Sequence, residues 1–313
     1  MNDVSKVIVI MTTFNGERYV EEQLLSILNQ KNVDLDIFIF DDCSTDKTVD
    51  VIQSLNSNKV RLFINEVATG SAGINFLQAL ISLGNNYFEN YDYVALADQD
   101  DLWDIEKLVR AVDELKKTSS VLYCSNLTLW NERRGTRKLL RKDYPQTQYD
   151  YLFEGGSAGC TYVFTIDFAR RLVKQLEVIE YKNWPFLSHD WLIYFYARVN
   201  DDLVYFDSNS YILYRIHDKN VHGHLNVFSF HTILAKSRLV RRGWYICNIR
   251  GFRQLMAKRP KVIDIYDSYE RNWKSRLWVC LKFNFRLMRS KKKFFNFFLI
   301  SMSVFPTTGG KGI

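Results

Sequence analysis

The feature that most constrains the fold is a regular alternation, across residues 1–125, between short apolar runs and segments of helical period. The runs carry few charges, as do strands that are buried on both faces of a sheet. Between them, apolar residues recur every three or four positions, which is the pattern of helices with one buried face. This βαβα order predicts an α/β fold, Rossmann-like, with a mostly parallel sheet and helices on both faces. The expected strands are 7–11, 36–40, 60–64, 93–97 and 121–124, with helical stripes at 20–28, 48–55, 74–81 and 105–115.

Distinctive polar residues follow three of these expected strands. The first runs into "TTFNGERY", the second into "DDCSTDKT" and the fourth into "DQDDLW". In open parallel sheets, ligands bind outside the carboxyl ends of the strands, so we expect the functional site there. No G-x-G-x-x-G or G-x-x-x-x-G-K-[ST] loop follows the first strand, which disfavours a dinucleotide cofactor and a P-loop. An acidic rim of this kind predicts that phosphate is bound through Mg²⁺ or Mn²⁺.

The segment after the fourth strand crowds Asp98, Asp100 and Asp101 into four positions. Close carboxylates raise one another's pKa unless a cation or a hydrogen-bond network neutralises them. We therefore expect positive charge nearby. From these residues alone the alternative is a solvated loop whose aspartates end the strand and cap the next helix.

Composition sets the limits on the class of protein. A chain of 313 residues, 47% of them hydrophobic, can bury a sizeable core. Its five cysteines include no Cys-x-x-Cys pair, and this favours a reducing cytosol. No basic, apolar signal sequence is seen in the opening residues "MNDVSKVIVIMTTFNG", so we expect a cytoplasmic protein.

The net charge of +7 conceals a strong asymmetry along the chain. Residues 227–313 carry 19 Lys and Arg against 3 Asp and Glu, whereas residues 1–226 carry 23 against 32. So basic a tail predicts an anionic partner, either nucleic acid or an anionic membrane.

Six motifs in fixed order extend through the first two thirds of the chain: "TTFNGERYVEEQLLSILNQ", "DDCSTDKTVDVI", "ALADQDDLW", "EGGSAGCTYVF", "SHDWLIY" and "YRIHDKNVHG". In this series the chain resembles the inverting family-two glycosyltransferases of GT-A fold, and among them the bacterial rhamnosyltransferases of polysaccharide assembly. The resemblance implies a GT-A catalytic domain over 1–226, with a nucleotide-sugar half at 1–125 and an acceptor half at 126–226. It also implies a nucleotide-sugar donor, Mn²⁺ or Mg²⁺, and transfer to an acceptor hydroxyl with inversion.

The resemblance assigns donor contacts to the strand ends. Thr12 and Thr13 match the segment that meets the base, and Asp42 matches the acid that accepts a hydrogen bond from the pyrimidine N–H. Asp98 and Asp100 match the D-x-D pair, the first facing the ribose or the metal and the second binding metal.

In the acceptor half, Asp190 matches the family's catalytic base, which removes the proton of the acceptor hydroxyl. The alternative is a helix N-cap worth about 1 kcal/mol. In relatives the segment containing Gly156, Ala158 and Gly159 lines the pocket for acceptor and donor sugar.

Further downstream, the resemblance points to His217 as a metal or diphosphate contact and to Arg215 near phosphate. A simple loop is the alternative for this segment. The His-x-His pair at 222 and 224 lacks partner ligands at zinc-finger spacing.

The basic tail predicts helices around 230–259 and 269–302. Its apolar end is shorter than the roughly 20 residues that span a bilayer. Basic residues interspersed with Trp, Phe and Leu favour a helix lying on an anionic membrane, which suits a lipid-linked glycan acceptor and a peripheral location on the inner face of the plasma membrane. The alternative is a helical pair packed on the catalytic domain or at a homodimer contact.

The resemblance to rhamnosyltransferases implies that the enzyme transfers L-rhamnose from dTDP-L-rhamnose. UDP-sugars carrying galactose, glucose or an N-acetylated sugar are the alternative donors. The Q-x-x-R-W signature of processive relatives is absent, which favours addition of a single sugar. A nucleic-acid-binding protein is a different class, disfavoured because the acidic body would repel the ligand. A sugar nucleotidyltransferase is also disfavoured, because its reaction would give the Asp190 segment no role.

Overall fold

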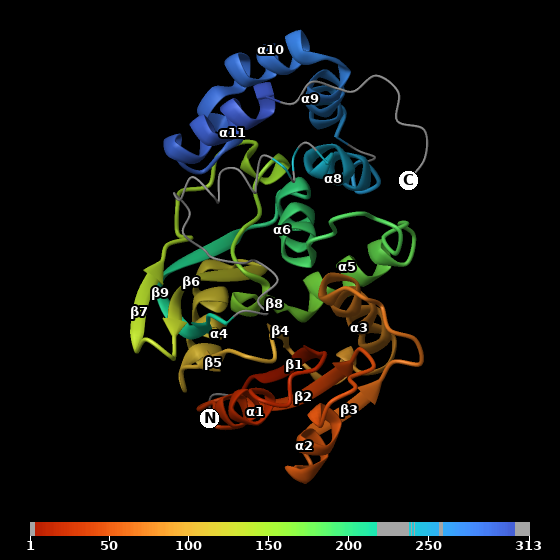
Figure 1. The fold of residues 1–313 in the computed structure, drawn as a ribbon, viewed down its shortest axis with the longest axis vertical. Coiled ribbons are helices and arrows are strands. Elements are labelled where there is room, and N and C mark those ends of the chain that lie inside the picture. The colour runs from red at the N-terminus through yellow and green to blue at the C-terminus, as the bar shows by residue number, and fades with distance from the viewer. Residues whose placement is uncertain (1–3, 218–237, 239, 241, 257–258, 304–313) are drawn as a thin grey trace. The chain divides into compact units, whose positions relative to one another are not determined.

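The computed structural model describes residues 4–217, 238, 240, 242–256 and 259–303 (Figure 1). Contacts divide the chain into two compact units. The first comprises residues 1–143, 156–182 and 188–220, and the second comprises 144–155, 183–187 and 221–313. The sequence placed the first two of these second-unit segments in the acceptor half. The predicted boundary at 226 lies outside the described residues.

The first unit is built on a sheet to which nine strands of the described residues contribute, in the order β3-β2-β1-β4-β8-β6-β9-β5, with β7 pairing β6. Four strands pair in parallel, and their cores are apolar as the sequence predicts. They are β1 (Lys6–Thr13), β2 (Asp34–Asp41), β3 (Val60–Ile64) and β4 (Tyr93–Ala97).

The other side of the sheet is mixed in direction. β8 (Val163–Thr165) runs antiparallel to both β4 and β6 (Leu122–Asn131), and β6 then pairs in parallel with β9 (Val204–Arg215). Two antiparallel strands complete it, β5 (Leu102–Trp103) on β9 and β7 (Thr136–Leu140) on β6.

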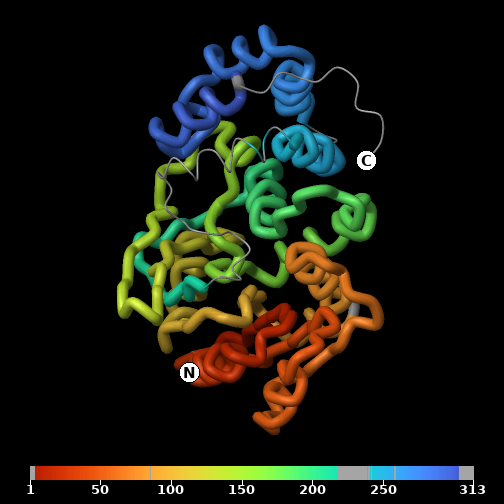
Figure 2. Tube along the Cα trace, in the orientation of Figure 1, coloured from red at the N-terminus to blue at the C-terminus, as the bar shows by residue number. Residues whose placement is uncertain are grey.

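The helices of the first unit connect these strands, as seen in the red-to-green part of Figure 2. The predicted helical stripes form the buried faces: Val20, Leu24 and Ile27 are fully buried in the first helix. The helices are α1 (Val20–Leu28), α2 (Thr48–Ser54), α3 (Ala72–Asn86), α4 (Lys107–Thr118), α5 (Ile166–Leu176) and α6 (His189–Val199), with short 3-10 turns η1 (Phe88–Asn90) and η3 (Gly159–Thr161).

The second unit is helical and has an aromatic core. Phe153 packs with its ring 4.8 Å from that of Tyr269 and 4.9 Å from that of Phe297. Trp184 packs edge-on against Phe252, 5.1 Å between centroids. Its elements are η2 (Asp150–Leu152), α8 (Trp244–Arg253), α9 (Pro260–Arg271), α10 (Trp273–Phe283), η4 (Asn284–Leu287) and α11 (Lys291–Ser303).

The expectation of one helix over 269–302 is wrong, because two asparagines break it. Asn272 is extended and caps α10 by accepting a hydrogen bond from the Ser275 N–H, 2.9 Å. Asn284 has a φ of +36°, outside the helical region, and ends α10. Within the described residues, no helix is long and apolar enough to cross a membrane.

Candidate active site

The parallel register brings the predicted polar residues to one edge of the sheet. Thr13 at the end of β1 is level with Asp41 at the end of β2, and Met11 is level with Ala97 at the end of β4. Asp98 therefore begins its loop beside the end of β1. The Thr13 hydroxyl donates to Asp41 over 2.7 Å, which ties two of these strand ends together.

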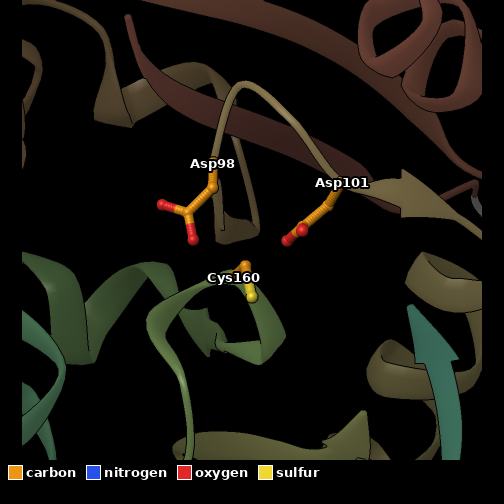
Figure 3. A group of neighbouring side chains, drawn as sticks. All are labelled: Asp98, Asp101 and Cys160. Carbon is orange, nitrogen blue, oxygen red and sulfur yellow. The ribbon is translucent and has the colours of Figure 1, made fainter. Parts of the chain in front are cut away.

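The acidic loop 98–101 leaves β4 and faces a cysteine of η3. Figure 3 shows Asp98 and Asp101 pointing from this loop toward Cys160, and one ligand atom of each lies within 4.8 Å of the others. Asp101 and Cys160 are each 1% exposed. The loop thus places carboxylate oxygens and a thiol around one small volume.

Burial and like charge act on this group together. Burial, then the charges of Asp100 and Asp190, raise the pKa of Asp98 to about 7. Burial, then the Asp100 and Asp98 carboxylates, raise the pKa of Asp101 well above its usual range. The crowding inferred from the sequence is therefore real, and a cation among these oxygens would relieve it.

Arg215, at the end of β9, clamps the acidic loop. It is 1% exposed, and its guanidinium donates to the Asp100 carbonyl over 3.0 Å and forms ion pairs with Glu22 and Glu132. Its guanidinium also lies 4.4 Å from the Trp130 ring centre. The predicted phosphate contact of Arg215 stays a prediction; here its charge is engaged by protein carboxylates.

His217 lies directly against the predicted metal ligand. Its Nε2 is 2.7 Å from Oδ2 of Asp100, and its ring stacks on Tyr19 with 5.1 Å between centroids. The structure thus pairs His217 with Asp100, whose carboxylate also acts electrostatically on Asp98. The metal-binding role of these three side chains stays a prediction. Lys219, His222 and His224 lie outside the described residues.

Asp42 is engaged with the loop that follows β3. Its carboxylate accepts hydrogen bonds from Asn65 Nδ2 at 2.9 Å, from Thr69 N at 2.7 Å and from Gly70 N at 3.0 Å. These hydrogen bonds hold the loop after β3 against Asp42, which directly follows β2. Thr12 and Thr13 are both buried beside it, 7% and 2% exposed. Their contacts with a base remain predictions.

Asp190 lies in the first turn of α6, after Ser188 at the N-cap position. Its Oδ1 accepts hydrogen bonds from the Trp191 N–H, 2.7 Å, and from the Ser188 hydroxyl. Its charge also acts on Asp98, so the two carboxyl groups are neighbours. The N-cap position itself belongs to Ser188, and Asp190 is the second residue of α6. Its role as the base stays a prediction.

The glycine-rich segment packs closely against side chains of the same unit. A Cβ on Gly156 would lie 2.7 Å from the Tyr162 hydroxyl, and one on Gly159 would lie 2.3 Å from Nε2 of His189. Ala158 accepts hydrogen bonds from Thr161 through its carbonyl. The glycines thereby let the η3 turn approach the start of α6, where Asp190 lies.

The sequence analysis assigned no functional role to two buried residues of this region. Cys160 belongs to a quoted motif but was given no role. Lys107, the first residue of α4, is 1% exposed and interacts with the charges of Asp101 and Cys160. The helix macrodipole disfavours a lysine at a helix N-terminus. This unusual position is the feature of the sequence that could have drawn attention to Lys107.

The residues present fit a hard divalent cation. Carboxylate oxygens of Asp98 and Asp100 with an imidazole nitrogen of His217 are ligand types that suit Mg²⁺ or Mn²⁺, and the Nε2 of His217 lies 2.7 Å from Oδ2 of Asp100.

Comparison with known proteins defines the family. The family model described as Glycosyl transferase family 2 matches residues 8–175. The chain belongs to that family. It is therefore an inverting glycosyltransferase, and the predicted enzyme class is confirmed.

One relative in this glycosyltransferase family is similar over most of both chains. The dTDP-rhamnosyl transferase RfbG of Shigella flexneri is 35% identical over 247 residues, covering 75% of this chain and 80% of that protein. This sequence identity confirms the resemblance to bacterial rhamnosyltransferases.

Two solved structures share the fold at low sequence identity. Residues 1–349 of Staphylococcus aureus TarS in complex with UDP superpose with a TM-score of 0.57 and 16% identity, covering 95% of this chain and 90% of that one. The mannosyltransferase PcManGT from Pyrobaculum calidifontis, in complex with GDP-Man and Mn²⁺, gives 0.53 and 13%, covering 96% and 87%. The predicted GT-A fold is confirmed.

Proposed function

We propose that this family-2 glycosyltransferase moves L-rhamnose from dTDP-L-rhamnose to an acceptor hydroxyl during synthesis of a cell-surface polysaccharide. The observation that carries the donor is the 35% identity, over most of both chains, with a protein named as a dTDP-rhamnosyl transferase. The strand-end site supports it, because carboxylates are the ligands through which a protein binds a metal diphosphate.

Within this proposal, Asp98, Asp100 and His217 hold Mn²⁺ or Mg²⁺. The bound metal supplies positive charge for the donor diphosphate, which becomes more negative as it leaves. Arg215 keeps the Asp100 backbone in place, and Thr12, Thr13 and Asp42 border the base. Gly156, Ala158 and Gly159 border the sugar, on a turn whose two glycines let its backbone pack closely against Tyr162 and His189.

Asp190 is proposed as the base. Inversion in one displacement requires a group that takes the proton of the acceptor hydroxyl while its oxygen attacks the anomeric carbon and the diphosphate departs. Asp190 suits this role because it neighbours Asp98 and is oriented by hydrogen bonds from Ser188 and Trp191.

Calorimetry with the full chain tests the donor. We expect dTDP-L-rhamnose to bind with Mn²⁺ and to bind far more weakly in EDTA, while UDP-glucose, UDP-galactose and UDP-N-acetylglucosamine bind poorly. Selective binding of a UDP-sugar would keep the glycosyltransferase and discard rhamnose. Equal donor affinity with and without EDTA would discard the metal.

We also propose that the acceptor is a lipid-linked glycan and that the second unit attaches the enzyme to an anionic membrane, at the inner face of the plasma membrane. Residues 271–303 contain nine Lys and Arg and no Asp or Glu. Large apolar side chains are exposed among them. These are Trp273 at 49%, Trp278 at 48%, Leu281 at 64%, Phe285 at 39%, Phe295 at 56% and Leu299 at 65%, here called the basic aromatic face.

Contacts within the basic aromatic face combine charge with apolar surface. The Phe285 and Phe295 rings lie 5.9 Å apart, with the Lys291 ammonium 5.6 Å from the Phe285 centroid. On α10, the Lys282 ammonium lies 4.2 Å from the Trp278 centroid. Aromatic and aliphatic side chains flanked by lysines suit the interface of an anionic bilayer.

A further inference from the structure

The side chain of Gln99 reaches from the acidic loop to the backbone of the loop that follows β1. Its Oε1 accepts the Phe14 N–H over 2.9 Å, and its Nε2 donates to the Phe14 carbonyl over 3.1 Å. The two bonds engage both hydrogen-bonding groups of one residue, as a neighbouring antiparallel strand does. Gln99 thereby fixes the separation between Phe14 and the acidic loop.

A glycine leaves the room that this amide needs. A Cβ on Gly16 would lie 2.2 Å from Oε1 of Gln99 and 2.6 Å from its Cδ, so the flexible Gln99 side chain would have to move and lose its bonds to Phe14. Gly16 does not have a positive φ. Close approach, rather than a special backbone angle, therefore explains the glycine at this position.

The loop that follows β2 holds residues 14–17 from another side. The next three backbone N–H groups donate to side-chain oxygens of residues 44–48: Asn15 to Ser44 over 2.9 Å, Gly16 to Thr48 over 2.7 Å and Glu17 to Asp46 over 3.2 Å. Of these four consecutive N–H groups, that of Phe14 is the one that binds the acidic loop. Residues 14–17 are thus a fixed segment to which Gln99 ties the acidic loop.

Gln99 links two groups of residues that the proposed donor contacts. Phe14 directly follows Thr13 of the base group, and Gln99 lies between Asp98 and Asp100 of the metal group. A nucleoside diphosphate bound with metal spans both groups. Such a ligand binds more tightly when the separation of its two contact regions is already fixed, because less conformational freedom is lost on binding.

We propose that Gln99 is a positioning residue that couples the base end of the donor site to its metal end, so that nucleotide and metal each strengthen the binding of the other. The identity of these two ligands rests on the proposed function, whereas the contact of Gln99 with Phe14 does not. The middle residue of the D-x-D pair then acts through the backbone of Phe14 rather than on the ligand.

Calorimetry on the full chain tests the coupling with Gln99→Met, which keeps the length of the side chain and removes both hydrogen bonds. Three titrations are compared: Mn²⁺ alone, dTDP in EDTA, and dTDP with saturating Mn²⁺. We expect the first two affinities to stay close to wild type and the gain in dTDP affinity from Mn²⁺ to fall roughly tenfold. An unchanged gain, or an equal loss in all three titrations, would overturn the coupling.

Two further variants separate coupling from a general effect on the fold. Gln53→Met changes an exposed glutamine of α2 and should leave all three titrations unchanged. Gly16→Ala displaces the Gln99 amide without altering the acidic loop, and it should reproduce the loss of coupling. Combined with Gln99→Met it should add no further loss, because both changes break the same contact. Additive losses would overturn the role of this contact.

Hydrogen exchange in EDTA tests the coupling without metal. We expect dTDP to slow exchange of the amides of residues 14–17 and 98–101 in the wild type, but only those of 14–17 in Gln99→Met. An equal response of residues 98–101 in both proteins would overturn the coupling. If dTDP affinity in the wild type does not respond to Mn²⁺, the metal in the proposed function is refuted, and exchange in EDTA still decides the coupling. UDP replaces dTDP throughout if only UDP binds, an outcome that would discard the proposed nucleotide alone.

Discussion

At the scale of single residues, the site is a set of carboxylates whose environments differ. The pKa of Asp98 is raised by burial and by two acidic neighbours, Asp101 is buried at 1% exposure, and Asp100 pairs with an imidazole. Burial and neighbouring groups thus give three carboxyl groups of one loop different environments.

Replacing Asp100 by Asn should abolish transfer while leaving the fold intact. The carboxylate is 16% exposed and pairs with His217, so its loss removes the proposed metal ligand and little packing. We expect a loss of at least about 10²-fold in kcat/KM with a Tm within a few degrees of wild type. Undiminished turnover with unchanged melting would remove Asp100 from the metal site.

Replacing Asp190 by Asn should lower the rate of sugar transfer while leaving the affinity for the donor unchanged. The amide still accepts from the Trp191 N–H, so α6 should start as before. Loss of a general base lowers the rate by about 10²–10⁴-fold, and this should appear in kcat with donor affinity retained in calorimetry. A variant with wild-type kcat would return Asp190 to a structural role.

The sequence could predict those residues whose role depends on type and strand-end position. Asp98, Asp100 and His217 were assigned in that way, and the structure shows the contact between His217 and Asp100; their role at a metal stays a prediction. The engagement of Arg215 by Glu22 and Glu132 could not be predicted, because its partners lie 193 and 83 positions away along the chain. Such long-range pairing leaves no periodic trace in a sequence.

At the scale of elements, α10, η4 and α11 combine two properties that seldom coincide on a surface. Their exposed apolar side chains lie among lysines and arginines, and residues 271–303 include no acid. Isolated exposed leucines are common, whereas a basic apolar surface of this kind supports the proposed membrane attachment.

Phe295→Ser with Leu299→Ser should weaken membrane binding by tenfold or more, because each large apolar side chain contributes about 1.5–3 kcal/mol when fully buried. Sedimentation with vesicles containing phosphatidylglycerol measures this, against vesicles of phosphatidylcholine alone. The matched control is Val178→Ser with Leu203→Ser, which are 77% and 60% exposed in the first unit. Equal losses in both double variants, or no binding by the wild type, would contradict the membrane face.

A buried ionic cluster should make the stability of the second unit depend on pH. Glu154 pairs with Arg289 at 3.2 Å and with Lys293, and Asp150 lies 3.7 Å from Arg289. Burial opposes ionisation of Glu154, but Arg289 and Lys293 outweigh it and lower its pKa below 4.5. The stabilisation is therefore fully present above pH 4.5 and is lost as the pH falls through the lower folded value.

Glu154→Gln should accordingly lower stability by about 3 kcal/mol at pH 7, the low end for a broken buried pair because Asp150 remains beside Arg289. The gap between variant and wild type should narrow below pH 4.5. Denaturant unfolding at several pH values measures it. A gap that stays constant down to pH 3 would show that the ionised carboxylate is not the source.

At the scale of the whole molecule, the first half of the sheet could be predicted, and the second only at the start of β6. β4 is buried along its whole length, and such a strand is evident from its apolar composition; β3 also coincides with an apolar run, although it is only partly buried. β5 and β8 have two and three residues, too few for any period, and β9 is interrupted by the polar run 207–210. Pairing with distant strands, rather than local sequence, defines them.

The second unit draws on segments around 150, around 185 and beyond 220, so it is not a module that could be cut away or fused elsewhere. A protein ended at residue 220 would keep Phe153 and Trp184, which are 2% and 6% exposed, but not the aromatic residues of α8, α9 and α11 that cover them. We expect such a truncation to be insoluble or to bind hydrophobic dyes, whereas a soluble, cooperatively melting product would show that these segments refold without the tail. Exchanging C-terminal halves between relatives should succeed only when residues 144–155 and 183–187 travel with them.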